Sequence, residues 1–207
     1  MFMVRVLFVC LGNICRSPIA QGVFEEVVRR EGLEGEIEAD SCGTHSYNLG
    51  KAPDERAQKS ATRRGIDISS QRARRLTPED CRRFDYILVM DKKNRRRVKR
   101  LCKGVAAEVR LFLDYAPERP EREVPDPYHG GPEGFEVVMD LVQAASEGLV
   151  KDIRRRHLLH LSGRSPLPTS RSRSTPTVLP PGPTSGSARL WTLGFRLWRT
   201  CAAKWRR

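Results

Sequence analysis

The sequence predicts an α/β fold in which a parallel sheet of about four strands is flanked by helices. Three observations support this prediction: short apolar runs typical of buried strands, helical segments that alternate with them, and capping or turn residues at the junctions. The chain has 207 residues, which is enough for one ordinary domain and an appendage.

The first strand and helix are expected to follow each other directly. Residues 4–9 are almost continuously apolar, as in a central parallel strand that is covered on both faces, and the run ends at Cys10. Pro18 suits the first turn of a helix and Ser17 suits its cap, and an apolar stripe continues to Val27.

The same alternation continues along the chain. We expect further strands at residues 37–41, 86–90 and 109–113, and helices at residues 53–64, from 77–80 onward, at 91–101 and at 133–156. The helix at 53–64 should stop at Gly65.

The composition changes near residue 161, which divides the chain into an expected domain at 1–161 and an extension at 162–207. Of the formal net charge of +13, the extension supplies nine, because it has nine Lys and Arg and no acidic residue. Its Ser, Pro and Arg content predicts disorder to about residue 188. A basic amphipathic helix at 188–207, with Trp191, Trp198 and Trp205 seven residues apart, would suit weak contact with an anionic membrane or an acidic partner. A shifted reading frame or unselected sequence is the alternative.

The remaining body is nearly balanced in charge, so no nucleic acid is expected as a partner. The basic run at residues 92–97 is interpreted as a solvated helix face rather than a nucleic-acid contact. No signal sequence and no apolar run of about 20 residues is present. The six cysteines lack metal-ligand spacing or the density of a disulfide scaffold, which predicts a reducing cytoplasm and no metal.

The strongest functional pattern lies at the end of the first predicted strand, where open parallel sheets bind ligands. Five residues separate Cys10 from Arg16, and a helix begins just after Ser17. A loop this short can turn its backbone N–H groups around one tetrahedral anion. The pattern therefore predicts a phosphate site. A buried strand-end thiol beside a surface arginine is the plainer alternative.

Each residue type in this loop has a chemical task. Cys10 is expected to be a thiolate nucleophile, and Arg16 can bind two phosphoryl oxygens through its planar fork. Gly12 should permit backbone angles closed to other residues, whereas Asn13 tolerates the left-handed region and pins the loop. Ser17 can donate a hydrogen bond to the Cys10 sulfur. No cofactor is needed for this chemistry.

Residues 6–18, VLFVCLGNICRSP, resemble the active-site signature of the low-molecular-weight protein tyrosine phosphatases. Further matches lie at residues 40–44, 53–57, 84–91 and 125–128, so the resemblance covers about residues 3–156. It implies a flavodoxin-like three-layer sandwich and hydrolysis of phosphotyrosine through a phosphocysteine intermediate. Phosphotyrosine-containing proteins would be the partners of a monomeric enzyme.

The resemblance also assigns residues outside the loop. Asp126 would be the general acid and then the general base, although on its own it is only an acidic residue in a turn. Tyr47 and Tyr128 would flank the entrance and stack on an aromatic ring. Ile14 favours phosphotyrosine, because related arginine phosphatases have Thr there. Ser41 would bond Asn13 and brace the loop.

Other loop and wall positions bear on substrate fit and redox control. Leu11 and Cys15 complete the substrate-binding loop, and the resemblance implies that Cys15 can form a reversible disulfide with the nucleophile. His129 stands where a second Tyr is usual, so it lines one wall of the cleft or is an ordinary loop residue. Cys42 replaces the usual Ala and is interpreted as a small core residue, with redox involvement as the alternative.

The main rival from another class is a thioredoxin-coupled arsenate reductase, which shares the fold and the anion loop. That activity needs two relay cysteines with six residues between them. Cys81 lies near the right region, but position 88 is Leu and Cys102 is far along the chain. The pattern therefore favours the phosphatase.

Overall fold

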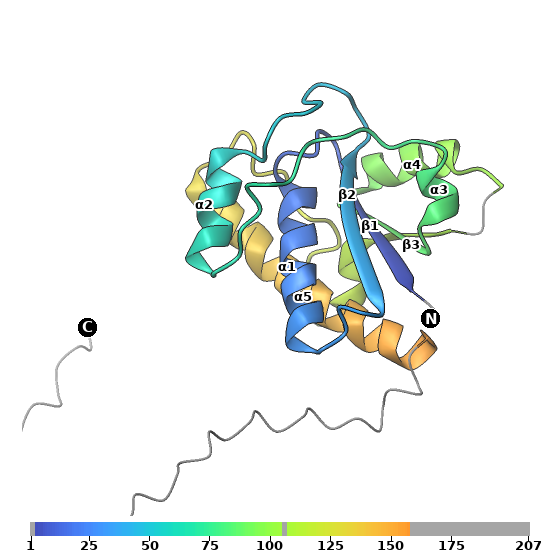
Figure 1. Ribbon diagram of the computed structural model, residues 1–207. Helices are drawn as coiled ribbons and strands as arrows, with labels where there is room; N and C mark the ends of the chain where they lie inside the picture. Colours follow the sequence, from blue (N-terminus) through green and yellow to red (C-terminus); the bar gives the residue numbers. More distant parts are fainter. Residues whose placement is uncertain (1–2, 105–106, 158–207) are drawn as a thin grey trace, which may run out of the picture. The chain divides into compact units, whose positions relative to one another are not determined.

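The computed structural model describes residues 3–104 and 107–157. Four strands are present, β1 Val4–Cys10, β2 Ile37–Gly43, β3 Tyr86–Val89 and β4 Glu108–Leu111. The helices are α1 Arg16–Arg30, α2 Glu55–Arg63, α3 Asp80–Arg83, α4 Lys92–Leu101 and α5 Pro132–His157, and a 3₁₀ helix, η1, spans Phe112–Tyr115 (Figure 1).

The strands form one parallel sheet in the order β2-β1-β3-β4. Helices α1 and α5 cover one face, and α3 and α4 lie on the other (Figure 1). The predicted four-stranded parallel sheet between layers of helices is thereby confirmed. Because all strands run the same way, their carboxyl ends meet at one edge of the sheet, where β1 ends at Cys10.

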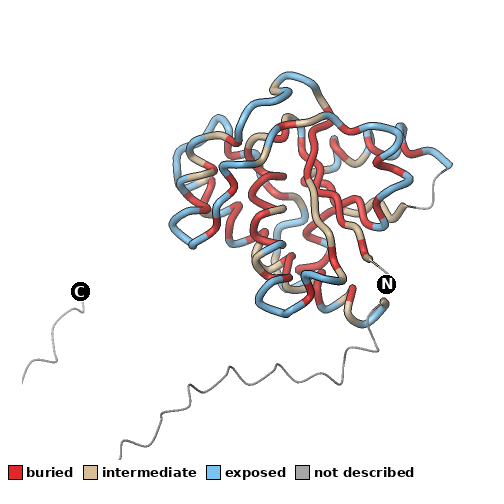
Figure 2. The backbone as a smooth tube through the Cα atoms, in the orientation of Figure 1, coloured by how far each residue is buried: buried red, intermediate tan, exposed pale blue. Residues whose placement is uncertain are grey.

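Burial of strand β1 on both of its faces explains why its sequence is apolar at every position but one. Val6, Phe8 and Cys10 belong to the core beneath α1 and α5, whereas Leu7 and Val9 belong to the core on the opposite face. All five are buried, as the red tube at the centre of Figure 2 shows. A strand covered on both faces cannot alternate apolar with polar residues.

Two element boundaries differ from the prediction near the site. Helix α1 begins at Arg16, with Cys15 at the cap position and no side-chain cap, so the assignment of Ser17 as the cap was wrong. Strand β2 continues past Ser41 to Gly43, because its last residues pair with the end of β1. The loop between β1 and α1 is therefore only five residues long, Leu11 to Cys15.

A disulfide joins Cys81 of α3 to Cys102, the residue that caps the end of α4. The spacing of the cysteines did not predict it, because the two residues are 21 positions apart in the sequence. The bond becomes understandable from the fold, since both residues are buried in the same core beneath α3 and α4.

The predicted extension at 162–207, its helix at 188–207 and the domain boundary at 161 lie outside the described residues. Within residues 3–104 and 107–157, no helix is both long enough and apolar enough to cross a bilayer.

We predict that Gly148→Ala lowers the free energy of unfolding by about 3 kcal/mol, because α5 packs directly on η1. A Cβ atom at Gly148 would lie 1.8 Å from the carbonyl oxygen of Tyr115, so helix and backbone must separate. Urea unfolding followed by circular dichroism measures the change. Gly134→Ala in the same helix is the control, since its nearest neighbour would be the Pro127 Cβ at 3.4 Å. Equal stability of the two variants would contradict this packing argument.

Candidate active site

The loop between β1 and α1 is turned inward around the Cys10 sulfur. The backbone N–H of Asn13 donates to Cys10 Sγ at 3.2 Å, and the Ser17 hydroxyl lies 3.1 Å from the same atom. The Ser17 hydroxyl is also 3.3 Å from the Cys42 carbonyl, which is an alternative acceptor. Two donors therefore face the sulfur, as expected for a site that stabilises a thiolate.

Asn13, rather than Gly12, provides the unusual backbone conformation of the loop. Asn13 has φ 55°, in the left-handed region, whereas Gly12 is not among the residues with positive φ. The prediction of special backbone angles at Gly12 was therefore wrong. A Cβ at Gly12 would lie 2.8 Å from the side-chain amide nitrogen of Asn48, an atom at the end of a half-buried side chain.

The side chain of Asn13 holds the loop from behind. Its amide nitrogen donates to Ser17 Oγ at 2.9 Å and to Ser41 Oγ at 3.0 Å. Its amide oxygen accepts a hydrogen bond from the backbone N–H of Arg74 at 2.9 Å. The expected bond between Asn13 and Ser41 is present, and the buried amide is satisfied on both sides.

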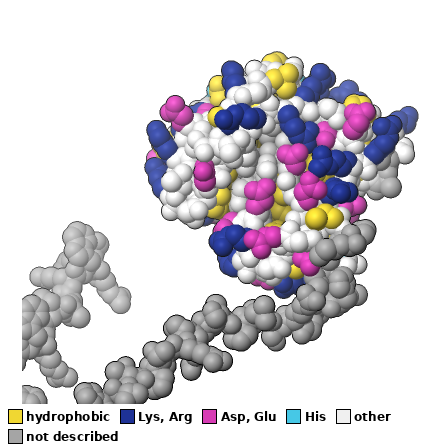
Figure 3. Space-filling view, in the orientation of Figure 1, with side chains coloured by type: hydrophobic (Ala, Val, Ile, Leu, Met, Phe, Trp, Pro, Cys, Tyr) yellow, Lys and Arg dark blue, Asp and Glu magenta, His cyan; other side chains and the backbone are white. Residues whose placement is uncertain are grey.

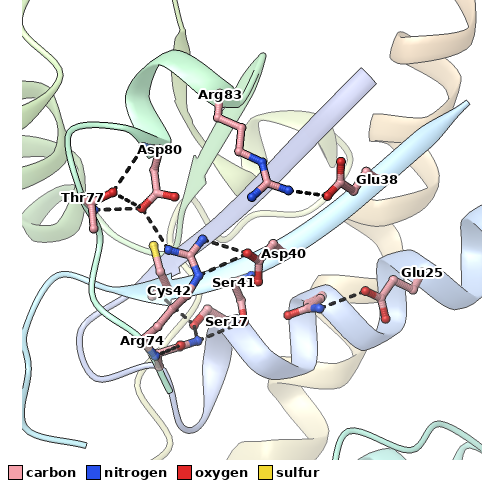
Figure 4. Close-up of polar contacts among 12 residues, drawn as sticks. Ser17, Glu25, Glu38, Asp40, Ser41, Cys42, Arg74, Thr77, Asp80 and Arg83 are labelled. Atoms are coloured by element: carbon pink, nitrogen blue, oxygen red, sulfur yellow. Dashed lines mark hydrogen bonds and ion pairs between the residues drawn. The ribbon is translucent and has the colours of Figure 1, made fainter. Parts of the chain in front are cut away.

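Arg74 ties this loop to a second layer of charged residues that sequence reasoning missed. Its guanidinium binds Asp40 at 2.8 Å and Asp80 at 2.9 Å, and Asp80 also accepts the backbone N–H of Thr77 (Figure 4). Burial by itself would lower the pKa of Arg74, but its hydrogen bond to Asp80 and the charge of Asp40 raise it. The charged form is thus retained behind the loop.

Arg16 is buried and joins the loop to two distant acids. It donates to Asp91 at 2.8 Å, to Asp126 at 2.7 Å and to the Val124 carbonyl at 3.2 Å. Burial alone would lower the pKa of Arg16, but Cys10, Asp126 and Asp91 raise it above its ordinary value. The guanidinium therefore stays charged next to the sulfur.

The loop forms the floor of a cavity of about 280 Å³. Asp126, Tyr47, Tyr128 and His129 line its sides, together with Asn48, which sequence reasoning missed. The predicted loop residues that line it are Cys10, Leu11, Gly12, Ile14, Cys15 and Arg16. The remaining predicted residues, Asn13, Ser17 and Ser41, do not line the cavity; they are buried, and the Asn13 side chain is hydrogen-bonded to the other two.

The two tyrosines stand at the rim rather than in the interior. Tyr47 is 71% exposed and Tyr128 is 47% exposed. His45 stacks on Tyr47 with ring centroids 5.0 Å apart, and His129 packs edge-on against Tyr128 at 5.1 Å. Both rings are thus available to an aromatic substrate while a histidine supports each one.

Arg56 fastens the segment that carries Asp126, although only the match at residues 53–57 hinted at it. Its guanidinium pairs with Asp54 at 2.9 Å and donates to the carbonyl oxygens of Tyr128 and Gly130. The same group lies 5.6 Å from the Tyr128 ring centroid and 5.0 Å from that of Phe135. One cation therefore links α2, the Asp126 segment and α5.

Two further free cysteines, Cys15 and Cys42, lie near Cys10 and are buried. Burial, followed by the charges of Asp54 and Cys10, raises the pKa of Cys15 to about 12. Cys42 is fully buried in the core of the opposite sheet face, and that burial raises its pKa as well. Both are therefore protonated thiols near neutral pH, which fits Cys42 as a small core residue.

The cysteines considered for the arsenate reductase relay, Cys81 and Cys102, are bonded to each other and lie 21 positions apart, so they lack the relay spacing of six intervening residues. Cys81 and Cys102 pack in the core beneath α3 and α4, whereas Cys10 faces the core beneath α1 and α5. Strand β1 therefore separates the disulfide from the nucleophile candidate. In the described part of the chain, no group of three or more His, Cys, Asp or Glu is placed to hold a metal ion.

Together, the parallel sheet and this loop define an α/β protein with a cysteine-containing anion site at the carboxyl edge of its sheet. The sequence profile of the family described as low molecular weight phosphotyrosine protein phosphatase matches residues 5–158. The chain belongs to this family, which confirms the resemblance seen in the sequence.

Individual relatives agree with the assignment. A putative low molecular weight protein-tyrosine-phosphatase of Synechocystis is 42% identical over 153 residues, covering 72% of this chain and 96% of that protein. The human low molecular weight phosphotyrosine protein phosphatase is 43% identical over 136 residues, covering 64% and 85%. The crystal structure of YfkJ from Bacillus subtilis superposes with a TM-score of 0.72 at 36% identity, covering 76% and 98%.

We predict that Gly43→Ala weakens binding of inorganic phosphate by about tenfold, because the anion loop would be displaced. A Cβ at Gly43 would lie 2.9 Å from the Leu11 carbonyl oxygen and 3.1 Å from the Gly12 carbonyl carbon. Protection of Cys10 from iodoacetate by increasing phosphate measures the affinity. Gly134→Ala is again the matched control, and urea unfolding excludes a general loss of structure. Unchanged phosphate protection in a folded Gly43→Ala variant would contradict the prediction.

Proposed function

We propose that this protein hydrolyses phosphotyrosine in proteins through a phosphocysteine intermediate. Cys10 Sγ attacks phosphorus, the P–O bond to tyrosine breaks, and Asp126 gives its proton to the departing phenolate oxygen. Asp126 then takes a proton from water, which attacks phosphorus and breaks the S–P bond. Inorganic phosphate leaves, and the Cys10 thiolate and the Asp126 carboxyl group return to their starting states.

The single observation that carries this proposal is the position of Arg16 between the anion loop and Asp126. Its Nη2 lies 2.7 Å from Asp126 Oδ2, and its backbone begins the helix that closes the loop. A phosphoryl group bound in the loop would compete with Asp126 for the guanidinium. We infer that this exchange frees the carboxyl group to face the leaving oxygen, while Asp91 continues to hold Arg16 at 2.8 Å.

The walls of the cavity support phosphotyrosine as the substrate. Tyr47 and Tyr128 offer exposed rings at the rim, so a phenyl ring could stack between them while its phosphate reaches the loop. Ile14 adds an apolar surface to the same cavity. A short phosphoserine would not span from rim to loop. Ser17, 3.1 Å from the sulfur, would stabilise the thiolate as it leaves phosphorus.

We further propose that the protein acts as a monomer. We also propose that it acts in a reducing compartment such as the cytoplasm, because Cys10 must be a free thiol to attack. The Cys81–Cys102 disulfide favours an oxidising compartment instead. Labelling of free thiols in extracts prepared under acid would show whether this disulfide is present in the cell.

Weak contact of the 188–207 segment with anionic membranes is a proposal from sequence alone. Its test compares liposome binding of the full chain and a chain that ends at residue 160.

We predict that Asp126→Asn lowers kcat/KM for phosphotyrosine by about 10²- to 10⁴-fold, because the phenolate must leave without a proton. The loss should be smaller for p-nitrophenyl phosphate, whose leaving group is more acidic and needs less protonation. Cys10→Ser should abolish turnover on both substrates. Steady-state kinetics measure these effects, and Asp114→Asn, an exposed acid in η1, is the control. Equal losses on both substrates would contradict the assignment of Asp126 as the general acid.

We predict that Cys15→Ser recovers less activity than the wild type after peroxide and subsequent reduction. Peroxide converts the Cys10 thiolate to a sulfenic acid, and the Cys15 thiolate then attacks that sulfur and expels hydroxide as the disulfide forms. Because the pKa of Cys15 is about 12, disulfide formation should accelerate about tenfold per pH unit from pH 7 to 9.

Recovery of activity and the mass of the peptide that contains residues 10–15 measure this protection. Cys42→Ala is the control, because Cys42 is buried on the opposite face of the sheet. The idea fails if Cys15→Ser recovers as fully as the wild type.

A further inference from the structure

A second hollow, which we call the basic groove, lies beside the cavity that contains Cys10. It has a volume of about 720 Å³, and three exposed arginines, Arg75, Arg97 and Arg100, line it. Leu76 and Leu101 are among its apolar lining residues. No acidic side chain of the described residues lines the groove.

The three arginines of the groove lack acidic partners among the described residues. Arg74, the residue before Arg75, binds both Asp40 and Asp80. By contrast, none of the three groove arginines forms an ion pair with a carboxylate in residues 3–104 or 107–157. Three like charges around one hollow repel each other, so an anionic ligand would be favoured there.

Helix α4 strengthens the positive potential of the groove. Its sequence, KKNRRRVKRL, has seven basic residues and no acidic one. In Figure 3, Lys and Arg side chains are numerous on the side of the molecule where α3 and α4 lie. The run at 92–97 was expected to be a solvated helix face, and Arg97 is the member of that run that lines the groove.

The groove and the catalytic cavity share a wall. Thr44 lines the groove, and its backbone N–H donates to the Cys10 carbonyl at 2.9 Å. The next residue, His45, lies 2.9 Å from Arg97 and stacks on Tyr47 at the cavity rim. Burial lowers the pKa of His45, and the charges of Arg97 and Arg75 lower it further. The positive charge of Arg97 and Arg75 therefore acts on the wall that the groove shares with the cavity.

We propose that the basic groove docks an acidic segment of the phosphoprotein substrate, close in sequence to the phosphotyrosine held in the cavity. This inference rests on the proposed function. Arginine forks bind carboxylates in a bidentate manner, and the apolar lining around Leu76 and Leu101 suits the side chains between them. A concave hollow next to the catalytic site fits a peptide better than a flat membrane or a rigid duplex.

The test compares phosphotyrosine peptides that carry three Glu residues on the N-terminal or the C-terminal side with peptides that carry Gln instead. The readout is the ratio of kcat/KM for the Glu peptide to that for its Gln partner within each enzyme. For wild type we expect a ratio of about three to ten on at least one side at low salt. The ratio should fall toward one at about 0.5 M salt, because the charges are screened.

The matched variants separate the groove from net charge. Arg75→Gln with Arg100→Gln should bring the ratio close to one, and Arg97 is left intact because it contacts His45. Arg30→Gln with Lys151→Gln removes the same charge from a different hollow, between α1 and α5, and should keep the wild-type ratio.

Each other outcome is informative. A wild-type ratio of one, with the Gln peptides hydrolysed, overturns the docking site but leaves the proposed function standing. Equal loss in both double variants assigns the effect to net charge and also overturns it. If the groove variant instead loses binding to an oligonucleotide or to phosphatidylserine vesicles, with the peptide ratio unchanged, the partner is a different one. Failure to hydrolyse any of the peptides contradicts the proposed function, and the docking site with it.

Discussion

The buried guanidinium of Arg16 is the charge around which the site is arranged. A buried cation is costly unless it is paired and hydrogen-bonded, and Arg16 meets this requirement with Asp91, Asp126 and the Val124 carbonyl. Asp91 caps the start of α4, whereas Val124 and Asp126 lie in the segment before α5. Because Asp126 is one of the groups that neutralise Arg16, the same ion pair places the candidate acid beside the loop that carries Cys10.

The geometry of the loop depends in turn on Asn13. A left-handed backbone at a non-glycine residue persists only where its surroundings hold it, and here Ser17, Ser41 and the Arg74 backbone do so. The salt bridges of Arg74 to Asp40 and Asp80 then fix the segment between α2 and α3 that supplies the last of these bonds (Figure 4). The loop is thus supported from behind by neutral hydrogen bonds and, beyond them, by the half-buried ion pairs of Arg74.

The two sides of the site differ in whether their arginines are paired with acidic residues. Toward α2 and α5, Arg56 is paired with Asp54 and fastens the Asp126 segment. Toward α4, the arginines of the basic groove have no acidic partners among the described residues. The first set stabilises the protein's own chain, whereas the second leaves positive charge available to a ligand. The shared wall at His45 and Tyr47 joins that charge to the substrate entrance.

The sequence by itself determined the features that depend on neighbouring residues: the order of strands and helices, the Cys10–Arg16 loop and the left-handed Asn13. Strand periodicity, capping and a short loop before a helix are local, so they can be seen without a fold. Tertiary structure alone decided the Arg74 bridges, the Arg56 contacts, the Cys81–Cys102 bond and the basic groove. Their partners lie far apart in sequence, and only the packing of α3 and α4 on one face, and of α1 and α5 on the other, sets which side chains meet.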